Sequence, residues 1–238
     1  MPEIITVSER RGLSGNILKL VAAAAMLVDH IGVVFFPYNL TFRMIGRLAF
    51  PIFAFMIAEG CHYTKNRARY FLGIFLLGAL CQAVYFFVSG DTYLNILLTF
   101  SCSIPLVYLL QEWKARHNLL LMLPFTMAVA IAYVCHQHVH LDYGFWGIMV
   151  PVFTAVAYPL RRAPIEKRHH LLRVAFLALA LIPSAMSNPR LQPYSFLALP
   201  LVLLYSGKRG KGRFKYAFYL FYPLHLALLQ GIDWLLTT

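Results

Sequence analysis

Long runs of apolar residues, separated by short basic clusters, most strongly constrain the fold of this chain. The first run, from Ile17 to Phe36, is long enough for a helix to cross a bilayer. Further runs follow, so that the set occupies residues 17–36, 44–62, 70–88, 93–111, 118–135, 143–160, 171–186, 191–205 and 216–236. Only 13% of the 238 residues are charged, against roughly 25% in soluble domains. The sequence therefore predicts an all-α integral membrane protein, a polytopic bundle of about nine transmembrane helices.

The basic residues fall mainly on one side of these predicted spans. All but three of the 21 lysines and arginines lie at the N-terminus or in every second loop, and the exceptions are Arg43, Arg47 and Arg190. Because cytoplasmic loops carry the excess of positive charge, we expect a cytoplasmic N-terminus and a C-terminus outside. The short runs at 171–186 and 191–205 form either two spans or a re-entrant hairpin, and both leave this orientation unchanged.

The chain shows no internal repeat, linker or low-complexity tract. We expect a cytoplasmic N-terminal segment, residues 1–16, and a single transmembrane domain, residues 17–238. A net charge of +12 would suggest nucleic-acid binding in a soluble protein, but here the charges mark topology and we expect no nucleic-acid partner. The four cysteines have no CxxC spacing and are interpreted as small apolar core residues: Cys61, Cys81, Cys102 and Cys135.

Two adjacent ionisable residues, Asp29 and His30, interrupt the first apolar run, which also contains Lys19 near its start. A charged side chain at mid-helix costs about 2.5–3.5 kcal/mol on insertion scales, so such residues are candidates for a functional site. Lys19 precedes His30 by about three helical turns, which places both on one helix face about 16 Å apart. The alternative is a lysine that reaches the membrane surface and a hydrogen-bonded core histidine. Asp29 lies about 100° from His30 around the helix, and we expect it to pair with Arg47 rather than Arg43.

Three further polar positions allow both structural and functional interpretations. Glu59 is predicted to pair with Lys65 or Arg67 at the membrane surface. Asn95 is either a helix-packing amide or a ligand contact. His225, in the last run, suggests a polar cavity shared with the histidine of the first run.

The connection before the sixth run combines histidines and glycines. His136, His138 and His140 share one side of an extended strand, a spacing suited to Zn²⁺ or Cu²⁺. The loop is short and lacks a distant ligand, so we expect no metal requirement. Gly144 and Gly147 would let another helix or a substrate approach closely.

These residues resemble the TraX-like membrane proteins, the acetylases of conjugative pilins. The matching pieces are Leu18-Lys19 through Asp29-His30-Ile31-Gly32, Gly46-Arg47-Leu48-Ala49-Phe50-Pro51-Ile52-Phe53-Ala54, Asn95-Ile96-Leu97, Tyr143-Gly144 with Gly147, and Phe221-Tyr222-Pro223-Leu224-His225-Leu226. They follow the family order along nearly the whole chain. The spacing from Lys19 to His30 is also similar to a pattern of the wider type-three membrane acyltransferases, in which the first-span histidine is regarded as catalytic.

The resemblance implies transfer of an acetyl group from cytoplasmic acetyl-coenzyme A to an amine at the bacterial inner membrane, in the family the N-terminus of a pilin. A neutral His30 would act as general base. Arg47 would stabilise the oxyanion, with Asp29 in support. The expected donor-binding residues, which supply positive charge for phosphates, are Lys19, Arg67 and Arg69. The expected substrate-binding or supporting residues are Asn95, Tyr143, Gly144, Tyr222 and His225.

Other functions also use buried ionisable residues. A small secondary transporter would usually show a structural repeat, and none is visible. A non-enzymatic assembly partner for envelope structures is a further alternative. A last alternative is a membrane acyltransferase whose acceptor is a glycan or a lipid head group instead of an amine.

Overall fold

The computed structural model describes residues 12–90, 92–159, 167–210 and 215–237. Its helices, in chain order, are α1 (Gly15–Phe35), α2 (Leu40–Gly46), α3 (Ala49–Tyr63), α4 (Arg67–Ser89), α5 (Ile96–Arg116), the 3₁₀ helix η2 (Leu119–Leu121), α6 (Met122–His138), α7 (Gly144–Val156), α8 (Lys167–Ser187), the 3₁₀ helix η3 (Gln192–Ala198), α9 (Leu199–Leu203) and α10 (Lys215–Thr237). Within those ranges the only strand-like pairings are two isolated bridges, Leu13 with Tyr205 and Leu94 with Leu141. The predicted all-α fold is confirmed.

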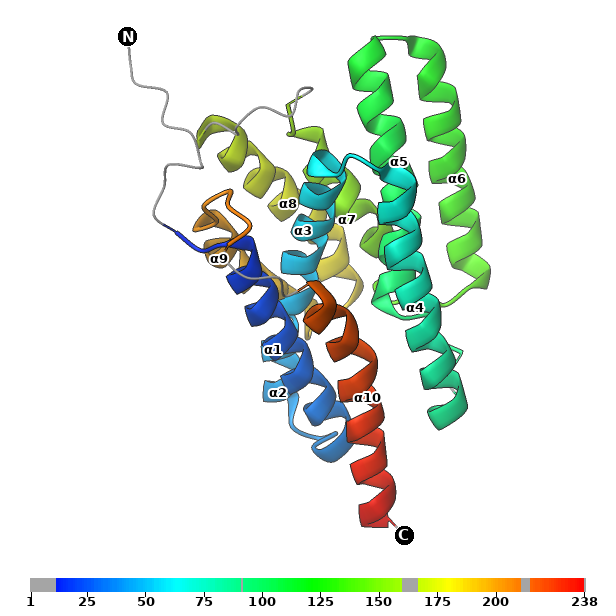
Figure 1. The fold of residues 1–238 in the computed structure, drawn as a ribbon, viewed down its shortest axis with the longest axis vertical. Helices are drawn as coiled ribbons and strands as arrows, with labels where there is room; N and C mark the ends of the chain where they lie inside the picture. The colour runs from blue at the N-terminus through cyan, green and yellow to red at the C-terminus, as the bar shows by residue number, and fades with distance from the viewer. Residues whose placement is uncertain (1–11, 91, 160–166, 211–214, 238) are drawn as a thin grey trace.

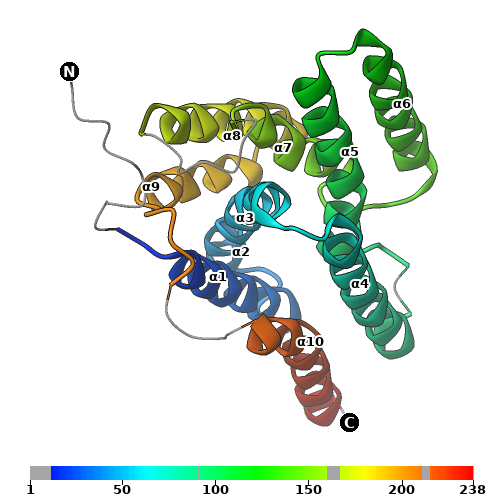
Figure 2. The same cartoon turned by 45° about the horizontal axis from the view of Figure 1, so that its top comes forward.

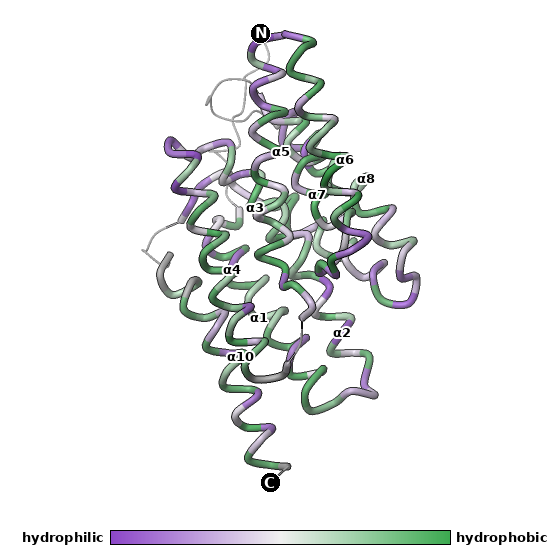
Figure 3. Tube along the Cα trace, turned by 90° about the vertical axis from the view of Figure 1, so that its right-hand side faces the viewer, coloured by the Kyte–Doolittle hydropathy of each residue, from purple (hydrophilic) through white to green (hydrophobic). Residues whose placement is uncertain are grey.

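The apolar helices fall into two length classes. Among the described residues, six helices are long and apolar enough to cross a membrane: Gly15–Phe35, Leu40–Tyr63, Arg67–Phe87, Ile96–Arg116, Leu119–His138 and Arg168–Ser187. Shorter apolar helices cover Gly144–Val156, Gln192–Leu203 and Leu220–Leu236. Figure 3 shows apolar residues along most of the helices and hydrophilic residues gathered near several connections. The chain is a helical membrane protein.

The helix α3 lies at the centre of the bundle. It contacts α1, α5, α7 and η3, while α1 also packs against α2 and α10 (Figures 1 and 2). On the other side, α5 packs against α4, α6 and α7. Fully buried apolar side chains from α1, α3, α5 and α8 join these layers, among them Leu18, Phe55, Phe100 and Leu177. The α1–α2 pair, the start of α5 and α10 border the pocket described below.

Several predicted runs differ from the observed helices. The run 44–62 is divided, because α2 ends at Gly46 and α3 begins at Ala49. The run 143–160 forms a helix only over Gly144–Val156. The run 171–186 lies within α8, which begins earlier, at Lys167, whereas 191–205 forms η3 and the short α9 rather than one regular helix.

Hydropathy did not separate core positions from membrane-facing ones. Cys61 and Cys81 are buried as predicted, but Cys102 and Cys135 are exposed, so their assignment to the core is wrong. Cys135 belongs to α6, in which no residue is buried. Because lipid is as apolar as a protein core, a helix surface that faces lipid has the same apolar composition as a buried one, and the sequence does not distinguish them.

Some predictions concern residues outside the described ranges. These residues include 1–11 of the expected N-terminal segment, with Arg10 and Arg11, and the basic loop residues Arg161, Arg162, Lys211 and Arg213.

Candidate functional site

Asp29, near the end of α1, binds two arginines of the following segment. Arg43 Nη1 lies 2.6 Å from Asp29 Oδ2, and Arg47 Nη2 lies 3.0 and 3.2 Å from the two carboxylate oxygens. Arg47 Nε also donates to the carbonyl oxygen of Arg43 at 3.3 Å. The predicted Asp29–Arg47 pair is confirmed, and Arg43 shares it. A buried pair of this kind fixes orientation more reliably than it adds stability.

Two glycines allow α1 and α2 to approach this closely. A Cβ at Gly46 would lie 2.1 Å from Asp29 Oδ1, and a Cβ at Gly32 would lie 2.3 Å from Phe42 Cβ. Neither contact is possible for a larger residue without a shift of the neighbouring helix. The glycines therefore place the arginines of the α2 segment against Asp29.

His30 contacts His225 of α10, which confirms the predicted meeting of the first and last apolar runs. His30 Nδ1 lies 2.8 Å from His225 Nε2, and His225 Nδ1 lies 2.7 Å from the carbonyl oxygen of Phe221. Because a carbonyl only accepts, His225 Nδ1 carries a proton, and a neutral His225 then accepts at Nε2. His30 therefore donates from Nδ1, and the Nε2 of a neutral His30 keeps a free lone pair.

The connection between α6 and α7 is held against the start of α5. The Asp142 N–H donates to the carbonyl oxygen of Leu94, and the Thr99 hydroxyl donates to the carbonyl oxygen of Asp142, both at 2.9 Å. Tyr143 has a left-handed backbone with φ 59° and stacks on Phe50, with ring centroids 3.8 Å apart. A non-glycine residue keeps this uncommon conformation only where the surrounding contacts determine it.

Gly147 makes this docking possible. A Cβ there would lie 2.7 Å from Tyr143 Cβ and 3.1 Å from Thr99 Cγ2. Gly144 begins α7 with φ 57°, a conformation that glycine adopts without strain. The predicted close approach at the two glycines is thus made by the protein's own chain.

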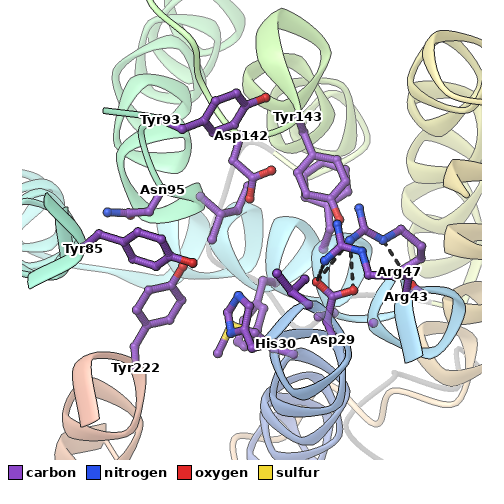
Figure 4. A pocket seen from close by; sticks show the side chains of 17 residues that line it. Asp29, His30, Arg43, Arg47, Tyr85, Tyr93, Asn95, Asp142, Tyr143 and Tyr222 are labelled. Carbon is purple, nitrogen blue, oxygen red and sulfur yellow. Dashed lines mark hydrogen bonds and ion pairs between the residues drawn. The ribbon is translucent and has the colours of Figure 1, made fainter. Parts of the chain in front are cut away.

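These elements line a partly open cavity of about 260 Å³ (Figure 4). The predicted site residues that line it are Asp29, His30, Arg47, Asn95, Tyr143 and Tyr222. His225 contacts the pocket residue His30, and Gly144 follows the pocket residue Tyr143. The structure therefore gathers residues from the first, second, fourth, sixth and last apolar runs around one space.

Asp142 also lines the cavity, and its environment changes its acidity. Burial raises the pKa of Asp142 to about 6, and the charge of Asp29 acts in the same direction. The charges of Arg47 and Arg43 oppose this rise. Asp142 is therefore ionised at neutral pH but is a stronger base than an ordinary aspartate.

Asn95 has a structural role at the pocket wall. Its Oδ1 accepts from the N–H groups of Leu97 and Leu98 at 3.0 and 3.4 Å, which caps α5. Its Nδ2 donates to the carbonyl oxygen of Gly78 at 2.8 Å and to Gln82 Oε1 at 3.1 Å. Asn95 therefore holds α4 and α5 together, and it also lines the pocket.

The three predicted donor-binding residues do not line this pocket. Lys19 is half-buried in the first part of α1. Arg67 is exposed, pairs with Glu112 and lies over the Tyr108 ring, 5.0 Å from its centroid. Arg69 is exposed on the first turn of α4.

Glu59 does not pair with Lys65 or Arg67, so that prediction is wrong. Arg173 Nη1 lies 2.6 Å from Glu59 Oε2. Arg173, expected in a cytoplasmic loop, is fully buried within α8. The partner is 114 positions away in sequence, so charge spacing near Glu59 gave no sign of it.

Glu59 and Arg173 form the centre of a second buried cluster. The hydroxyls of Tyr158 and Tyr205 donate to the Glu59 carboxylate at 2.5 and 2.9 Å. Arg173 Nη2 lies 3.0 Å from His170 Nδ1, and its guanidinium carbon lies 4.6 Å from the Tyr158 ring centroid. The cluster ties α3, α8 and the ends of α7 and α9 together.

The predicted extended histidine loop is also wrong. The helix α6 continues through His138, so His136 and His138 lie on a helix. His140 stacks on Tyr93, with centroids 6.1 Å apart, and the His136 ring lies beside Gly144. Across the part of the chain that the structure describes, no three His, Cys, Asp or Glu side chains are grouped to hold a metal ion.

Sequence reasoning did not single out Asp142, Tyr85 or Tyr93, which line the pocket. Asp142 directly precedes Tyr143-Gly144, and that position between two apolar runs was an available signal. The tyrosines Tyr85 and Tyr93 are two of 14 and carry no distinguishing spacing.

The pocket thus combines an imidazole lone pair, two guanidinium groups that share a carboxylate, and a second carboxylate. Such groups can accept a proton from a nucleophile, stabilise an anionic oxygen and hold a cation.

Comparison with known proteins identifies a family that the chain matches over most of its length. The model of the TraX protein family matches residues 14–233. The probable fimbrial assembly protein FimC, serogroup H1, of Dichelobacter nodosus is 29% identical over 239 residues, covering 89% of this chain and 92% of that protein. An uncharacterized protein of Rickettsia prowazekii (strain Madrid E) is 36% identical over 67 residues, covering 28% of this chain and 25% of that protein. No solved structure matches the chain.

Proposed function

We propose, since the chain belongs to the TraX family, that it transfers an acetyl group from acetyl-coenzyme A to an amine on a membrane-associated acceptor such as a pilin N-terminus. The observation that carries this proposal is the 2.8 Å contact of His30 with His225, which leaves His30 Nε2 as a base in a pocket with two arginines. The relative with a fimbrial assembly name supports a pilin as the acceptor.

In this proposal the chain lies in the bacterial inner membrane, with nine crossing segments, a cytoplasmic N-terminus and an external C-terminus. The six long helices and the three shorter apolar ones supply the segments. The one-sided distribution of basic residues supports the orientation. The pocket then lies toward the outer ends of α1 and α4, whereas Lys19 lies toward the cytoplasm.

The donor enters from the cytoplasmic side and extends along α1. Lys19 is within electrostatic range of Arg209, so the two cations supply charge for the nucleotide phosphates. Arg67 and Arg69 add exposed positive charge at the start of α4. The distance from Lys19 to His30 along the helix, about 16 Å, suits the extended thioester arm of a coenzyme A donor.

His30 acts as the general base for the transfer. The amine nitrogen attacks the thioester carbon, a C–N bond forms, and the carbonyl oxygen becomes an anion. His30 Nε2 accepts a proton from the nitrogen, the C–S bond breaks, and His30 returns the proton to the departing thiolate. His225 accepts the hydrogen bond from His30 Nδ1 and stabilises the transient imidazolium.

Arg47 and Arg43 stabilise the oxyanion. Each guanidinium has five N–H donors, and the contacts with Asp29 use only part of them. The shared carboxylate holds both arginines in place before the negative charge develops. Such preorganised donors are most effective in a site from which water is largely excluded.

The test uses the full-length protein in detergent with radiolabelled acetyl-coenzyme A. The acceptors are a peptide with a free N-terminus and the same peptide with a formylated N-terminus. Label is expected only on the free amine, and acetyl-coenzyme A should raise the melting temperature because it binds the folded state. Label on a glycan or lipid fraction instead, or neither label nor stabilisation, would overturn the proposal.

A further inference from the structure

Acetylation of an ammonium group requires two protons to leave one nitrogen. An α-ammonium has a pKa of about 7.7–8.0 and is largely protonated at neutral pH. The first proton leaves before attack, and the second leaves as the C–N bond forms. His30 returns one of them to the thiolate, so one proton remains to be released. If the proposed function holds, the pocket needs a second proton acceptor besides His30.

Asp142 is placed to be that acceptor. Of the two carboxylates that line the pocket, Asp29 is bound by Arg43 and Arg47, whereas Asp142 forms no ion pair with any described residue. Its backbone is fixed by the 2.9 Å bonds at Leu94 and Thr99 described above. Figure 4 shows its carboxylate pointing into the cavity, toward the side on which His30 lies.

Part of the remaining pocket wall is aromatic. Tyr85 from α4 and Tyr222 from α10 point into the same part of the cavity (Figure 4). Aromatic faces attract ammonium groups, and a carboxylate beside them adds a charge-assisted hydrogen bond. A hydroxyl acceptor would gain neither charge interaction.

The charge balance of the pocket also requires Asp142. Arg43, Arg47 and Asp29 together carry one net positive charge, which would repel an ammonium group. The ionised Asp142 cancels that charge. It therefore makes the empty pocket neutral at the point where a cation would enter.

We propose that the Asp142 carboxylate binds the ammonium group of the acceptor and takes its first proton, and that Asp142 thereby selects amines over alcohols. One N–H bond of the ammonium breaks, and Asp142 becomes a carboxylic acid. The neutral amine attacks the thioester, and its second proton passes through His30 to the thiolate. Asp142 then releases its proton to water, so that ammonium and thioester yield amide, thiol and one proton.

The pH range supports this assignment. With its pKa at about 6, Asp142 is ionised at neutral pH and closer to the pKa of an ammonium group than an ordinary aspartate is. The charged or titratable groups that face it are Arg43, Arg47, Asp29, Tyr143 and Tyr222. Affinity for an ammonium ligand should therefore fall as the pH falls through about 6.

The test compares two probes, alaninamide and lactamide, in which a hydroxyl replaces the ammonium group. Binding to the full-length protein in detergent is measured by calorimetry or ligand-observed NMR without acetyl-coenzyme A. The wild type should bind alaninamide about tenfold or more tightly than lactamide. Asp142→Asn should remove this preference, and Asp142→Glu should restore part of it. Asp233→Asn, the same chemical change on α10 outside the pocket, should leave it intact.

The outcomes separate this inference from the proposed function. Equal alaninamide affinity in the wild type and Asp142→Asn would overturn the ammonium site. That result would leave the proposed acetyl transfer untouched, because transfer is measured separately. If alaninamide binding depends on Asp142 but no acetyl group is transferred to any amine, the ammonium site is supported and the proposed acetyltransferase activity is wrong. If Asp142→Asn does not fold, the wild type decides the test: the alaninamide preference must disappear below about pH 6, and its persistence there contradicts the inference.

Discussion

Asp29 and Glu59 are both buried acids bound to arginine, but their surroundings differ. Glu59 accepts bonds from Arg173 and two tyrosines within closely packed helices. Asp29 lies on the wall of a cavity of about 260 Å³, beside His30 and across from Asp142. A buried charge in a membrane helix therefore does not by itself indicate a functional site. The adjoining cavity and the neighbouring histidine with a free lone pair make the Asp29 region the candidate site.

The largest effect on stability is expected at the Glu59 cluster. Glu59→Gln leaves the fully buried Arg173 without a compensating charge, which should reduce the free energy of unfolding by about 3–5 kcal/mol. Chemical unfolding in detergent measures this loss. Glu112→Gln, which weakens its exposed pairs with Arg67 and Arg116, should cost only about 0–1 kcal/mol. If Glu59→Gln is as stable as the wild type but no longer transfers the acetyl group, Glu59 has a role in the reaction and not in stability.

His225→Ala is expected to act on the reaction rather than on the fold. Without His225, His30 Nδ1 loses the hydrogen-bond acceptor that orients the ring and sets its tautomer. The value of kcat should then fall about 10–100-fold with little change in the KM for acetyl-coenzyme A. Steady-state kinetics separate the two constants. An unchanged kcat would show that the 2.8 Å contact has no role in the chemistry.

Asp142→Asn is expected to stabilise the folded protein while it removes amine selectivity. Burial raises the pKa of Asp142 from 3.8 to about 6, so its contribution to stability is present below the lower value and is lost as the pH rises through the upper one. Removal of the charge should therefore increase the free energy of unfolding at neutral pH by up to about 3 kcal/mol. The gain should vanish at about pH 4. A variant destabilised at neutral pH would show that the Asp142 charge supports the fold.

The smallest effect is expected at Lys19, which lies outside the pocket. Lys19→Ala should raise the acetyl-coenzyme A concentration for half-maximal transfer by about three- to tenfold, because one cation near the phosphates is lost. The value of kcat should stay the same. Lys65→Ala, an exposed lysine, serves as the control. An equal dependence on the donor in all three proteins would remove Lys19 from donor binding.

Local patterns predicted the helices and part of the site. Run length predicted the membrane helices, and the angle between Asp29 and His30 around α1 predicted that they face different partners. The Asp29–Arg47 pair could be anticipated because the next span begins nearby.

Pairings between distant helices were not predictable in this way. Glu59 and Arg173 are 114 residues apart, and the neighbouring Lys65 and Arg67 offered a closer but wrong partner. Asp142 gained its character from the fold, since burial that raises its pKa comes from helices far away in sequence. Apolar runs also gave no means of distinguishing the core from the lipid-facing surface of α6.

The central claim is that His30 is the base for acetyl transfer, and its removal tests this most directly. Radiolabelled transfer to a free N-terminus is measured with His30→Ala and with His138→Ala, an exposed histidine at the end of α6. We predict a loss of about 10²–10⁴-fold for His30→Ala, with stabilisation by acetyl-coenzyme A retained, and near-normal transfer for His138→Ala. Transfer at the wild-type rate by His30→Ala would contradict the account.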